Sequence, residues 1–177
     1  QEAARVTKLQ AAVEAGCAIF EQALRAPEGK RALEYLHGRG LTDETIARFR
    51  LGYAPNGNAV KSKLTQRGTP EDLLIETRLL SPGKDGRESF DFFRDRVIFP
   101  ILDQRGRPVA FGGRVMGEGD PKYLNSPDTP LFHKGQMLYG LSLAREAAAA
   151  KREIIVAEGY MDVIALAQAG FTHAVAP

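Results

Sequence analysis

The chain has 177 residues, enough for one domain or for a small domain joined to part of another. With 44% hydrophobic and 26% charged residues, no apolar run of about 18 residues and no apolar N-terminal segment, the composition argues against membrane insertion and secretion and predicts a cytoplasmic globular protein. The net charge of +2 is too small to indicate a nucleic-acid-binding protein by itself.

Lysine and arginine are nevertheless concentrated between residues 30 and 67, where eight of them stand against three acidic residues. This surplus fits either a solvated face or a surface that attracts nucleic acid. The single cysteine, Cys17, follows the apolar helical pattern of its segment, so packing is its expected role. The three histidines lack the spacing of zinc ligands, so no zinc site is expected.

The N-terminal half has mainly helical signals. Residues 4–24 have helical periodicity, and a second helix over residues 32–36 ends at Gly38 and Gly40. Thr42 is the predicted N-cap of a short helix that runs to Phe49, and residues 51–55 look extended. The next predicted helix begins with Thr69 as its cap and Pro70 at its first helical position, and it leads to a loop over residues 81–88.

The middle of the chain changes to apolar runs and two-residue periodicity. Residues 94–115 predict an antiparallel β-hairpin with its turn at residues 103–106. Residues 117–135 contain three prolines and three glycines, so they are predicted as a long structured loop rather than an element. Alanine-rich residues 141–151 predict a helix.

The last segment predicts one β-α-β unit. The apolar residues 154–157 indicate a strand covered on both faces, residues 163–169 a helix ending at Gly170, and residues 171–176 a second strand. A carboxylate, Glu158, stands where the first strand ends. Ligands of open α/β sheets bind beyond the carboxyl ends of the strands, so Glu158 points into the expected site.

Glu158 and Asp162 form the leading candidate for chemistry. Two carboxylates near a strand end can bind Mg²⁺, or one can act as a general base while the other holds a metal. Alternatively they only cap the helix that follows, with Asp162 near its positive end. Gly159 between them removes a side chain that would crowd an approaching ligand.

Two further segments contain candidate binding residues. Gly112 and Gly113 precede Arg114, so this strand could bulge or approach a phosphate that the guanidinium grips, or it could carry only a surface arginine. The long loop combines cationic, aromatic and small polar side chains, a mixture that suits single-stranded nucleic acid or nucleotide phosphates. The alternative is that Tyr123, Leu124 and Phe132 pin this loop to the core. The candidate ligands in the loop are Lys122, Tyr123, Asn125 and Lys134.

Several blocks of sequence, in one order, resemble the bacterial replicative DNA primases of the DnaG type. The resemblance covers the chain from about residue 30 onward. The blocks are YLHGRGL at 35–41, IARF at 46–49, LGYAP at 51–55, FRDRVIFPI at 93–101, FGGR at 111–114, PKYLNSP at 121–127, FHKG at 132–135, LYGL at 138–141 and EGYMDV at 158–163.

The resemblance implies part of the RNA polymerase core of a primase, which makes short RNA primers from nucleoside triphosphates on single-stranded DNA. It implies a basic, mixed α+β N-terminal subdomain with an antiparallel hairpin at residues 1–140. Residues 141–177 would then be the first β-α-β unit of an α/β Toprim domain, truncated at Pro177. The family's central catalytic carboxylate corresponds to Glu158, a possible Mg²⁺ ligand, with Asp162 beside it. The family's phosphate and nucleic-acid contacts carry over to Arg48, Arg114, Lys122 and Lys134.

The same resemblance implies cofactors and partners. A complete core would use Mg²⁺ or Mn²⁺, with the remaining metal ligands beyond Pro177, and zinc would belong to a separate N-terminal domain that these residues lack. Template DNA, the RNA/DNA hybrid and nucleoside triphosphates would bind the core, whereas the replicative helicase and the single-strand-binding protein would contact other parts, and no membrane is involved. The 177 residues alone are therefore expected to be inactive.

Two alternatives stay open at this point. The strand end at Glu158 would also suit another Toprim protein, a topoisomerase or a nuclease, although the blocks before residue 140 argue against one. The helices predicted between Ala32 and Phe49 superficially resemble a helix-turn-helix, which would make the chain a non-catalytic DNA-binding module.

Overall fold

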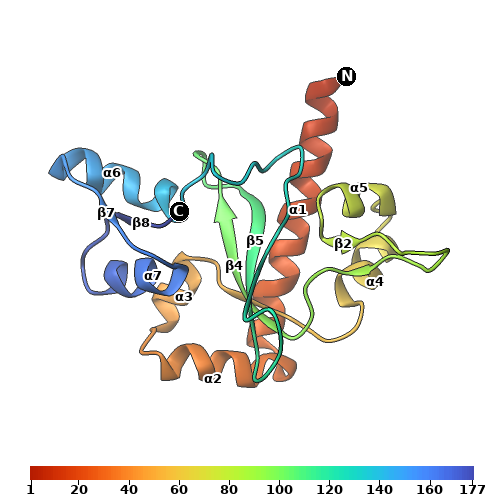
Figure 1. Cartoon of the computed structure of the whole chain (residues 1–177), viewed down its shortest axis with the longest axis horizontal. Helices are drawn as coiled ribbons and strands as arrows, with labels where there is room; N and C mark the ends of the chain where they lie inside the picture. The colour runs from red at the N-terminus through yellow and green to blue at the C-terminus, as the bar shows by residue number, and fades with distance from the viewer.

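The structure is a computed structural model that describes all of residues 1–177. A four-stranded antiparallel sheet forms the centre of the molecule (Figure 1). Its strand order is β1-β4-β5-β6, with β1 at Gly52–Ala54, β4 at Arg96–Leu102, β5 at Pro108–Val115 and β6 at Tyr123–Asn125. The predicted hairpin is confirmed as β4 and β5. The prediction of a loop without elements at residues 117–135 is wrong, because β6 pairs there with β5 and extends the sheet.

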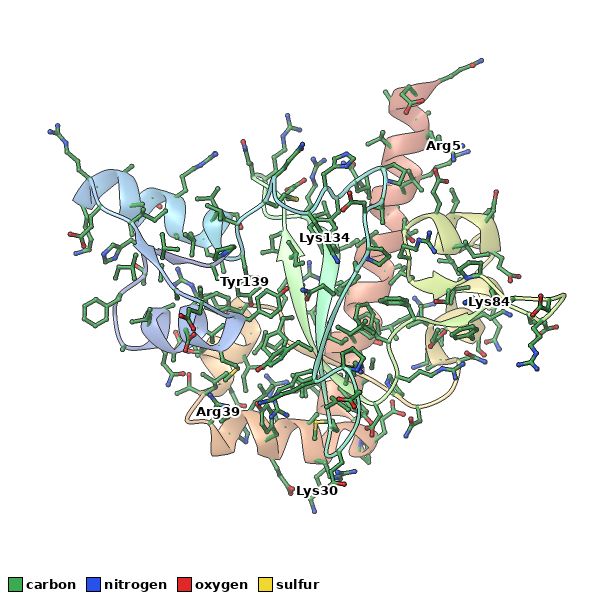
Figure 2. The ribbon with its side chains drawn as sticks, in the orientation of Figure 1. Arg5, Lys30, Arg39, Lys84, Lys134 and Tyr139 are labelled. Carbon is green, nitrogen blue, oxygen red and sulfur yellow. The ribbon has the colours of Figure 1, made fainter.

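Strand β4 is buried on both faces of the sheet, and side chains fill the space on either side (Figure 2). Its alternate residues Val97, Phe99 and Ile101 join one hydrophobic cluster. Ile98 joins the other, which α1 (Glu2–Arg25) covers. This alternation follows from the two-residue period of a strand. The sheet therefore divides the core into two layers.

Helix α1 packs closely against the sheet, as its predicted apolar stripe required. The ring of Phe20 meets the ring of Phe111 edge to face, with 5.2 Å between the centroids. Gly52 permits this approach, because a Cβ there would lie 2.6 Å from Cβ of Phe20. Cys17 is fully buried on the same helix, and burial raises the pKa of its thiol to about 12. The packing role predicted for Cys17 is confirmed.

The predicted second helix, its end at Gly38 and Gly40, and the predicted N-cap at Thr42 are also confirmed. The 3₁₀ turn Pro27–Gly29 leads into α2 (Lys30–Gly38), and Gly40 follows with a φ of +87°, where a side chain would be strained. Thr42 caps α3 (Asp43–Arg48), since its hydroxyl accepts a hydrogen bond from the N–H of Thr45 at 3.2 Å. Both helices pack into the cluster that contains Phe99, which the C-terminal end of α1 also joins through Ala23 and Leu24.

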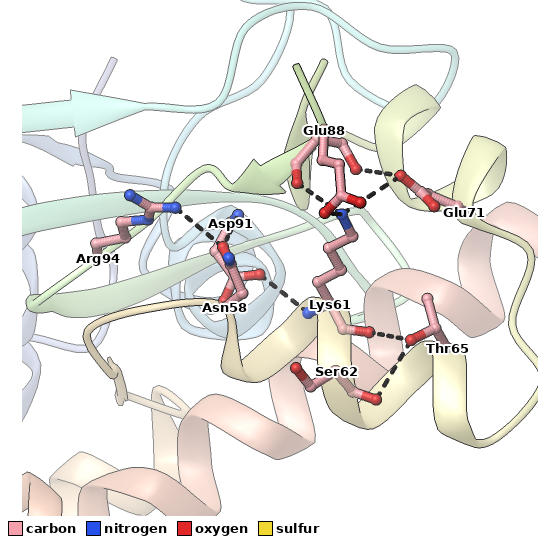
Figure 3. A network of polar contacts seen from close by, with 9 residues as sticks. Asn58, Lys61, Ser62, Thr65, Glu71, Glu88, Asp91 and Arg94 are labelled. Carbon is pink, nitrogen blue, oxygen red and sulfur yellow. Dashed lines mark hydrogen bonds and ion pairs between the residues drawn. The ribbon is translucent and has the colours of Figure 1, made fainter. Parts of the chain in front are cut away.

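The region between β1 and β4 contains elements that the sequence patterns missed. These are α4 (Ala59–Gln66), β2 (Leu80–Ser81) and β3 (Phe90–Asp91), the two strands pairing with each other. The helix predicted after Pro70 is confirmed as α5 (Glu71–Glu76). Thr69 is not the cap of α5, because Pro70 holds the N-cap position and no side chain caps the helix. Two free N–H groups at the N-terminus of α4 are hydrogen-bonded by a residue far away in the sequence. The buried Asp91 carboxylate accepts from the N–H groups of Val60 and Lys61, each at 2.9 Å (Figure 3).

The C-terminal segment forms the predicted β-α-β unit, with α6 (Leu141–Lys151), β7 (Ile155–Val156), α7 (Tyr160–Gln168) and β8 (Ala174–Val175). Strands β7 and β8 are parallel. The prediction that the first strand is covered on both faces is wrong here, since Ile154 is 45% exposed and Val156 65%. The outer edge of β8 is covered instead, because Tyr139 exchanges two backbone hydrogen bonds with Ala176.

This unit is joined to the rest of the molecule by a shared core and by one side chain. Met161 and Ile164 of α7 pack into the cluster that contains Phe99. Gln168 accepts a hydrogen bond from the N–H of Thr42 at 2.8 Å and donates one to the carbonyl of Gly40 at 2.6 Å. No helix is both long enough and apolar enough to cross a membrane.

Candidate active site

Glu158 and Asp162 line one cleft, which has a volume of about 380 Å³. Glu158 follows β7, and Asp162 lies in the first turn of α7. Across the cleft stand two side chains of β6, Tyr123 and Asn125, together with Arg39 from the C-terminal end of α2. The β-α-β topology therefore brings the two carboxylates to the same place as part of the predicted binding segment.

Neither carboxylate has a hydrogen-bond or ion-pair partner within the protein. The N-cap of α7 is Gly159, and no side chain caps that helix. Glu158 and Asp162 are exposed, so neither is held in the interior. Neither side chain therefore makes a capping hydrogen bond, whereas Asp162 does lie in the first turn of α7, near the positive end of the helix. Gly159 is not required for packing either, since a Cβ there would meet only Asp162 Oδ2 at 3.8 Å, and it leaves open space within the cleft.

The two carboxylates fit a Mg²⁺ site of the kind found in phosphoryl-transfer proteins. Such sites use one or two carboxylates, with water and substrate phosphates completing the octahedron. The structure contains no group of three or more acidic, histidine or cysteine side chains that could hold a metal ion. Glu158 and Asp162 can thus supply part of a ligand set, and phosphate oxygens or further carboxylates would have to supply the rest.

Two of the predicted binding residues flank the cleft without lining it. Lys134 lines an adjoining hollow of about 220 Å³, which shares Asn125 and Tyr160 with the cleft. The guanidinium of Arg114 lies 4.6 Å from the ring centroid of Tyr35 and 6.0 Å from that of Tyr123. Its buried Nε has no hydrogen-bond partner. Arg114 is thus held between two aromatic rings beside the cleft.

Lys122 and Arg48 are placed differently. Lys122 directly precedes β6, where its carbonyl accepts a hydrogen bond from the N–H of Val115 at 3.0 Å and its side chain is exposed. Arg48 does not line the cleft, because it faces a separate hollow beside Thr42 and Gln168. The structure therefore places Tyr123, Asn125, Arg114 and Lys134 in or beside one cleft, whereas Lys122 and Arg48 do not line it.

Arg39 is the cleft residue that the sequence patterns missed. It is the C-cap of α2 and stands between Gly38 and Gly40, in a turn that the sequence identified only as a helix end. Its guanidinium donates a long hydrogen bond of 3.4 Å to the hydroxyl of Tyr35. The position of Arg39 between two glycines was the one sequence feature that could have identified it as a binding residue. Arg48, nine residues later, has the same side chain, so the sequence alone could not favour Arg39 over it.

The two glycines before Arg114 serve packing. A Cβ on Gly112 would lie 2.4 Å from Cε2 of Tyr160, and one on Gly113 would lie 2.8 Å from Cδ1 of Phe93. The irregularity in the pairing of β4 with β5 falls between Ile101 and Leu102, away from the glycines. The predictions of a bulge or a phosphate approach at these glycines are therefore wrong, because protein side chains occupy the space.

The predicted anchoring of the loop is divided among its residues. Phe132 is 5% exposed and packs into the core, so it does pin the segment. Tyr123 is 43% exposed and leaves its ring available to a ligand. Anchoring and binding are thus carried out by different aromatic side chains of the same segment.

Part of the basic surplus between residues 30 and 67 is compensated by acids from outside it. Arg50 pairs with Glu14 at 2.6 Å and with Glu21 at 2.7 Å. Lys61 lies 3.7 Å from Glu71 and 3.8 Å from Glu88. Because these cations are paired, they do not contribute to a continuous basic face.

The fold and the cleft define a class of protein, the catalytic cores of DnaG-type primases. A solved DnaG primase catalytic domain bound to ssDNA superposes with a TM-score of 0.86 at 44% sequence identity, covering 98% of this chain and 54% of that one. The RNA polymerase domain of Mycobacterium tuberculosis DnaG, in complex with a double-stranded DNA oligomer with a 6-nucleotide overhang, superposes with a TM-score of 0.90 at 33% identity, covering 96% of this chain and 54% of that one.

The sequence agrees with the fold. Residues 19–145 match the family "DNA primase catalytic core, N-terminal domain", and the chain belongs to this family. A DNA primase of Pseudomonas putida is 52% identical over 167 residues, which are 93% of this chain and 25% of that protein. The chain thus spans about a quarter of the length of the curated relatives it matches. The predicted resemblance to DnaG-type primases is confirmed, and nothing in these similarities favours the topoisomerase, nuclease or helix-turn-helix alternatives.

Proposed function

We propose that this chain supplies part of the catalytic core of a DNA primase, which synthesises short RNA primers from nucleoside triphosphates on single-stranded DNA. In this proposal residues 1–140 form the N-terminal subdomain, and residues 141–177 begin the Toprim domain. One observation carries the proposal: two carboxylates that have no hydrogen-bond or ion-pair partner within the protein, Glu158 and Asp162, share a cleft with exposed cationic and aromatic side chains.

Each side chain has a role that its chemistry permits. A carboxylate oxygen of Glu158 accepts the proton of the attacking 3′-hydroxyl. The 3′-oxygen then forms a bond to the α-phosphorus of the nucleoside triphosphate, and the bond from that phosphorus to the oxygen of the β-phosphate breaks, so that pyrophosphate leaves. Asp162 and Glu158 are the proposed ligands for Mg²⁺ or Mn²⁺, which when bound would neutralise charge on the phosphates. Arg39, Arg114 and Lys134 attract phosphate groups.

Tyr123 and Lys122 are the proposed contacts to single-stranded nucleic acid. An exposed ring stacks on a base regardless of its identity, while a neighbouring ammonium group meets a phosphate. The solved DnaG structures in complex with ssDNA or with overhanging DNA support a DNA template as the partner. Arg48 stays a candidate contact outside the cleft. The zinc domain, the helicase and single-strand-binding protein partners and the cytoplasmic location stay predictions.

The test is Glu158→Gln in a primase chain as long as the curated relatives, which contains these 177 residues. The assay measures RNA primer synthesis on single-stranded DNA with all four ribonucleoside triphosphates and Mg²⁺. We expect synthesis to fall by roughly 10²-fold or more, the contribution typical of a general base. The thermal midpoint should not change, because Glu158 is exposed and unpaired. Glu146→Gln is the matched control, an exposed glutamate of α6 that does not line the cleft. Full synthesis by Glu158→Gln would contradict the proposal. Primer synthesis by the 177 residues alone would contradict the prediction that they are inactive by themselves.

A further inference from the structure

Tyr160 bridges the two sides of the cleft. Its hydroxyl donates a hydrogen bond of 2.7 Å to Oδ1 of Asn125, which joins the first turn of α7 to strand β6. Both residues line the cleft and also the adjoining hollow. The pair therefore forms the partition between these two spaces.

The ring of Tyr160 is held by its surroundings. It stacks on Phe99, with 5.4 Å between centroids and 28° between the planes, and it lies 4.5 Å from the ring of Tyr139. Gly112 leaves room for its edge. Burial raises the pKa of Tyr160 to about 12, so its hydroxyl is a neutral donor at pH 7. A donor in a fixed position can impose an orientation on the group that accepts from it.

The orientation in question is that of the Asn125 amide. A carboxamide has an oxygen that accepts and an NH₂ group that donates two hydrogen bonds. Oδ1 is engaged by Tyr160, and Asn125 is exposed, so the NH₂ group is left to solvent and ligand. If the amide were turned over, the phenol hydrogen of Tyr160 would lose the one acceptor it has. The hydrogen bond thus favours one of the two amide orientations.

We propose that Tyr160 is a positioning residue, which holds Asn125 so that its N–H donors face the cleft and select a ligand that presents phosphate oxygens. This inference rests on the proposed function, because the phosphates belong either to the incoming nucleotide or to the nucleic-acid backbone. The unfavourable amide orientation would point Oδ1 at those oxygens, acceptor against acceptor. Tyr160 acts through Asn125 and has no separate contact with the ligand.

The experiment is a double-mutant cycle with Tyr160→Phe, Asn125→Ala and the double variant. It uses a primase chain as long as the curated relatives, which contains these 177 residues. The measured quantities are kcat and KM for ATP in primer synthesis, and the Kd for a single-stranded oligonucleotide. We expect Tyr160→Phe to weaken one of the two ligands about fivefold, the effect of one hydrogen bond. It should have no further effect in the Asn125→Ala background. A raised KM for ATP identifies nucleotide phosphates, and a raised oligonucleotide Kd identifies backbone phosphates.

Tyr139→Phe is the matched control. It removes a second buried hydroxyl of the same aromatic cluster, one that has no hydrogen-bond partner and so makes no hydrogen bond to Asn125. Its KM and Kd should equal those of the unmodified protein. A purely structural role of Tyr160 would lower the thermal midpoint and leave KM and Kd unchanged. That result overturns the inference, as does an effect of Tyr160→Phe that persists in the Asn125→Ala background.

Failure of the proposed function gives a different result. An unmodified protein that makes no primers would contradict the primase proposal. Binding of ATP and of the oligonucleotide, measured without turnover on the same four proteins, then decides whether Tyr160 acts through Asn125. Unchanged binding across the four proteins overturns the inference.

Discussion

Tyr160 occupies the space that a side chain at Gly112 would need: a Cβ on Gly112 would lie 2.4 Å from Cε2 and 2.9 Å from Cζ of Tyr160. Strand β5 and helix α7 are therefore in close contact at Tyr160, a residue that lines the cleft. The ring belongs to the motif that carries the two carboxylates, whereas the glycine belongs to the hairpin. A substitution at Gly112 in β5 should consequently displace Tyr160 in α7.

Gly112→Ala should destabilise the protein and disturb the cleft. Overpacking a fitted contact costs about 1–3 kcal/mol, because Tyr160 must move and release Asn125. Urea unfolding measures the free-energy change, and nucleotide binding measures the displacement of the cleft. Gly38→Ala is the control, since a Cβ there meets nothing within 4 Å and the residue is helical, and it should be stabilising by up to about 1 kcal/mol. Equal effects of the two substitutions would refute the fit between Gly112 and Tyr160.

Asp91→Ala should unfold the start of α4. The carboxylate is 1% exposed and is the acceptor for the N–H groups of Val60 and Lys61, so its loss leaves two donors unsatisfied (Figure 3). We expect a loss of about 2 kcal/mol, near the upper range for a helix cap. Denaturant unfolding measures it. The control is Glu88→Ala, whose side chain is 92% exposed and meets Lys61 only at 3.8 Å, and a comparable loss there would contradict this account.

Gln168→Ala should loosen the contact between α7 and the turn that joins α2 to α3. Two hydrogen bonds to backbone groups are lost, which should cost about 1–2 kcal/mol in total. Hydrogen exchange provides a local measurement, because the amide of Thr42 should exchange faster in Gln168→Ala and stay protected in Gln168→Glu, which keeps the accepting oxygen. Gln66→Ala, at an exposed position, should change neither quantity. Unaltered exchange at Thr42 in Gln168→Ala would rule out the clamp.

Asp43 should make a small, acid-sensitive contribution to stability. Its Oδ1 lies 2.7 Å from Nε2 of His37 and 3.1 Å from Nη1 of Arg25, and these contacts, that of His37 first, lower the pKa of the Asp43 carboxyl. A depressed folded-state pKa contributes stability above the unfolded value of about 3.9 and loses it as the pH falls through the folded value. The thermal midpoint of Asp43→Asn should therefore fall below that of the unmodified protein at neutral pH, and the gap should close as the pH falls through the lowered pKa of the Asp43 carboxyl. A gap independent of pH would count against the ionised pair.

The sequence by itself determined the elements whose signals are local. The apolar stripe of α1, the turn between β4 and β5, the glycine at position 40 and the cap at Thr42 each act within a few residues, so their patterns identify the structure. The motif at residues 158–162 likewise identified both carboxylates of the cleft. The elements that were missed have weak local signals. Strand β6 forms because β5 offers it an edge, and α4 begins where it does because Asp91 reaches it from another part of the chain.

Only the tertiary structure decided which side chains meet. Arg39 and Arg48 are the same residue type at the ends of adjacent short helices, and Gln168 of α7 holds the turn between those helices. In this arrangement Arg39 lines the cleft and Arg48 lines another hollow. Packing likewise explains the two glycines before Arg114, whose missing side chains leave space for Tyr160 and Phe93 rather than for a ligand. These are contacts between residues far apart in the chain. A linear pattern records which groups are present, whereas their distances and orientations follow from how the elements fill a common core.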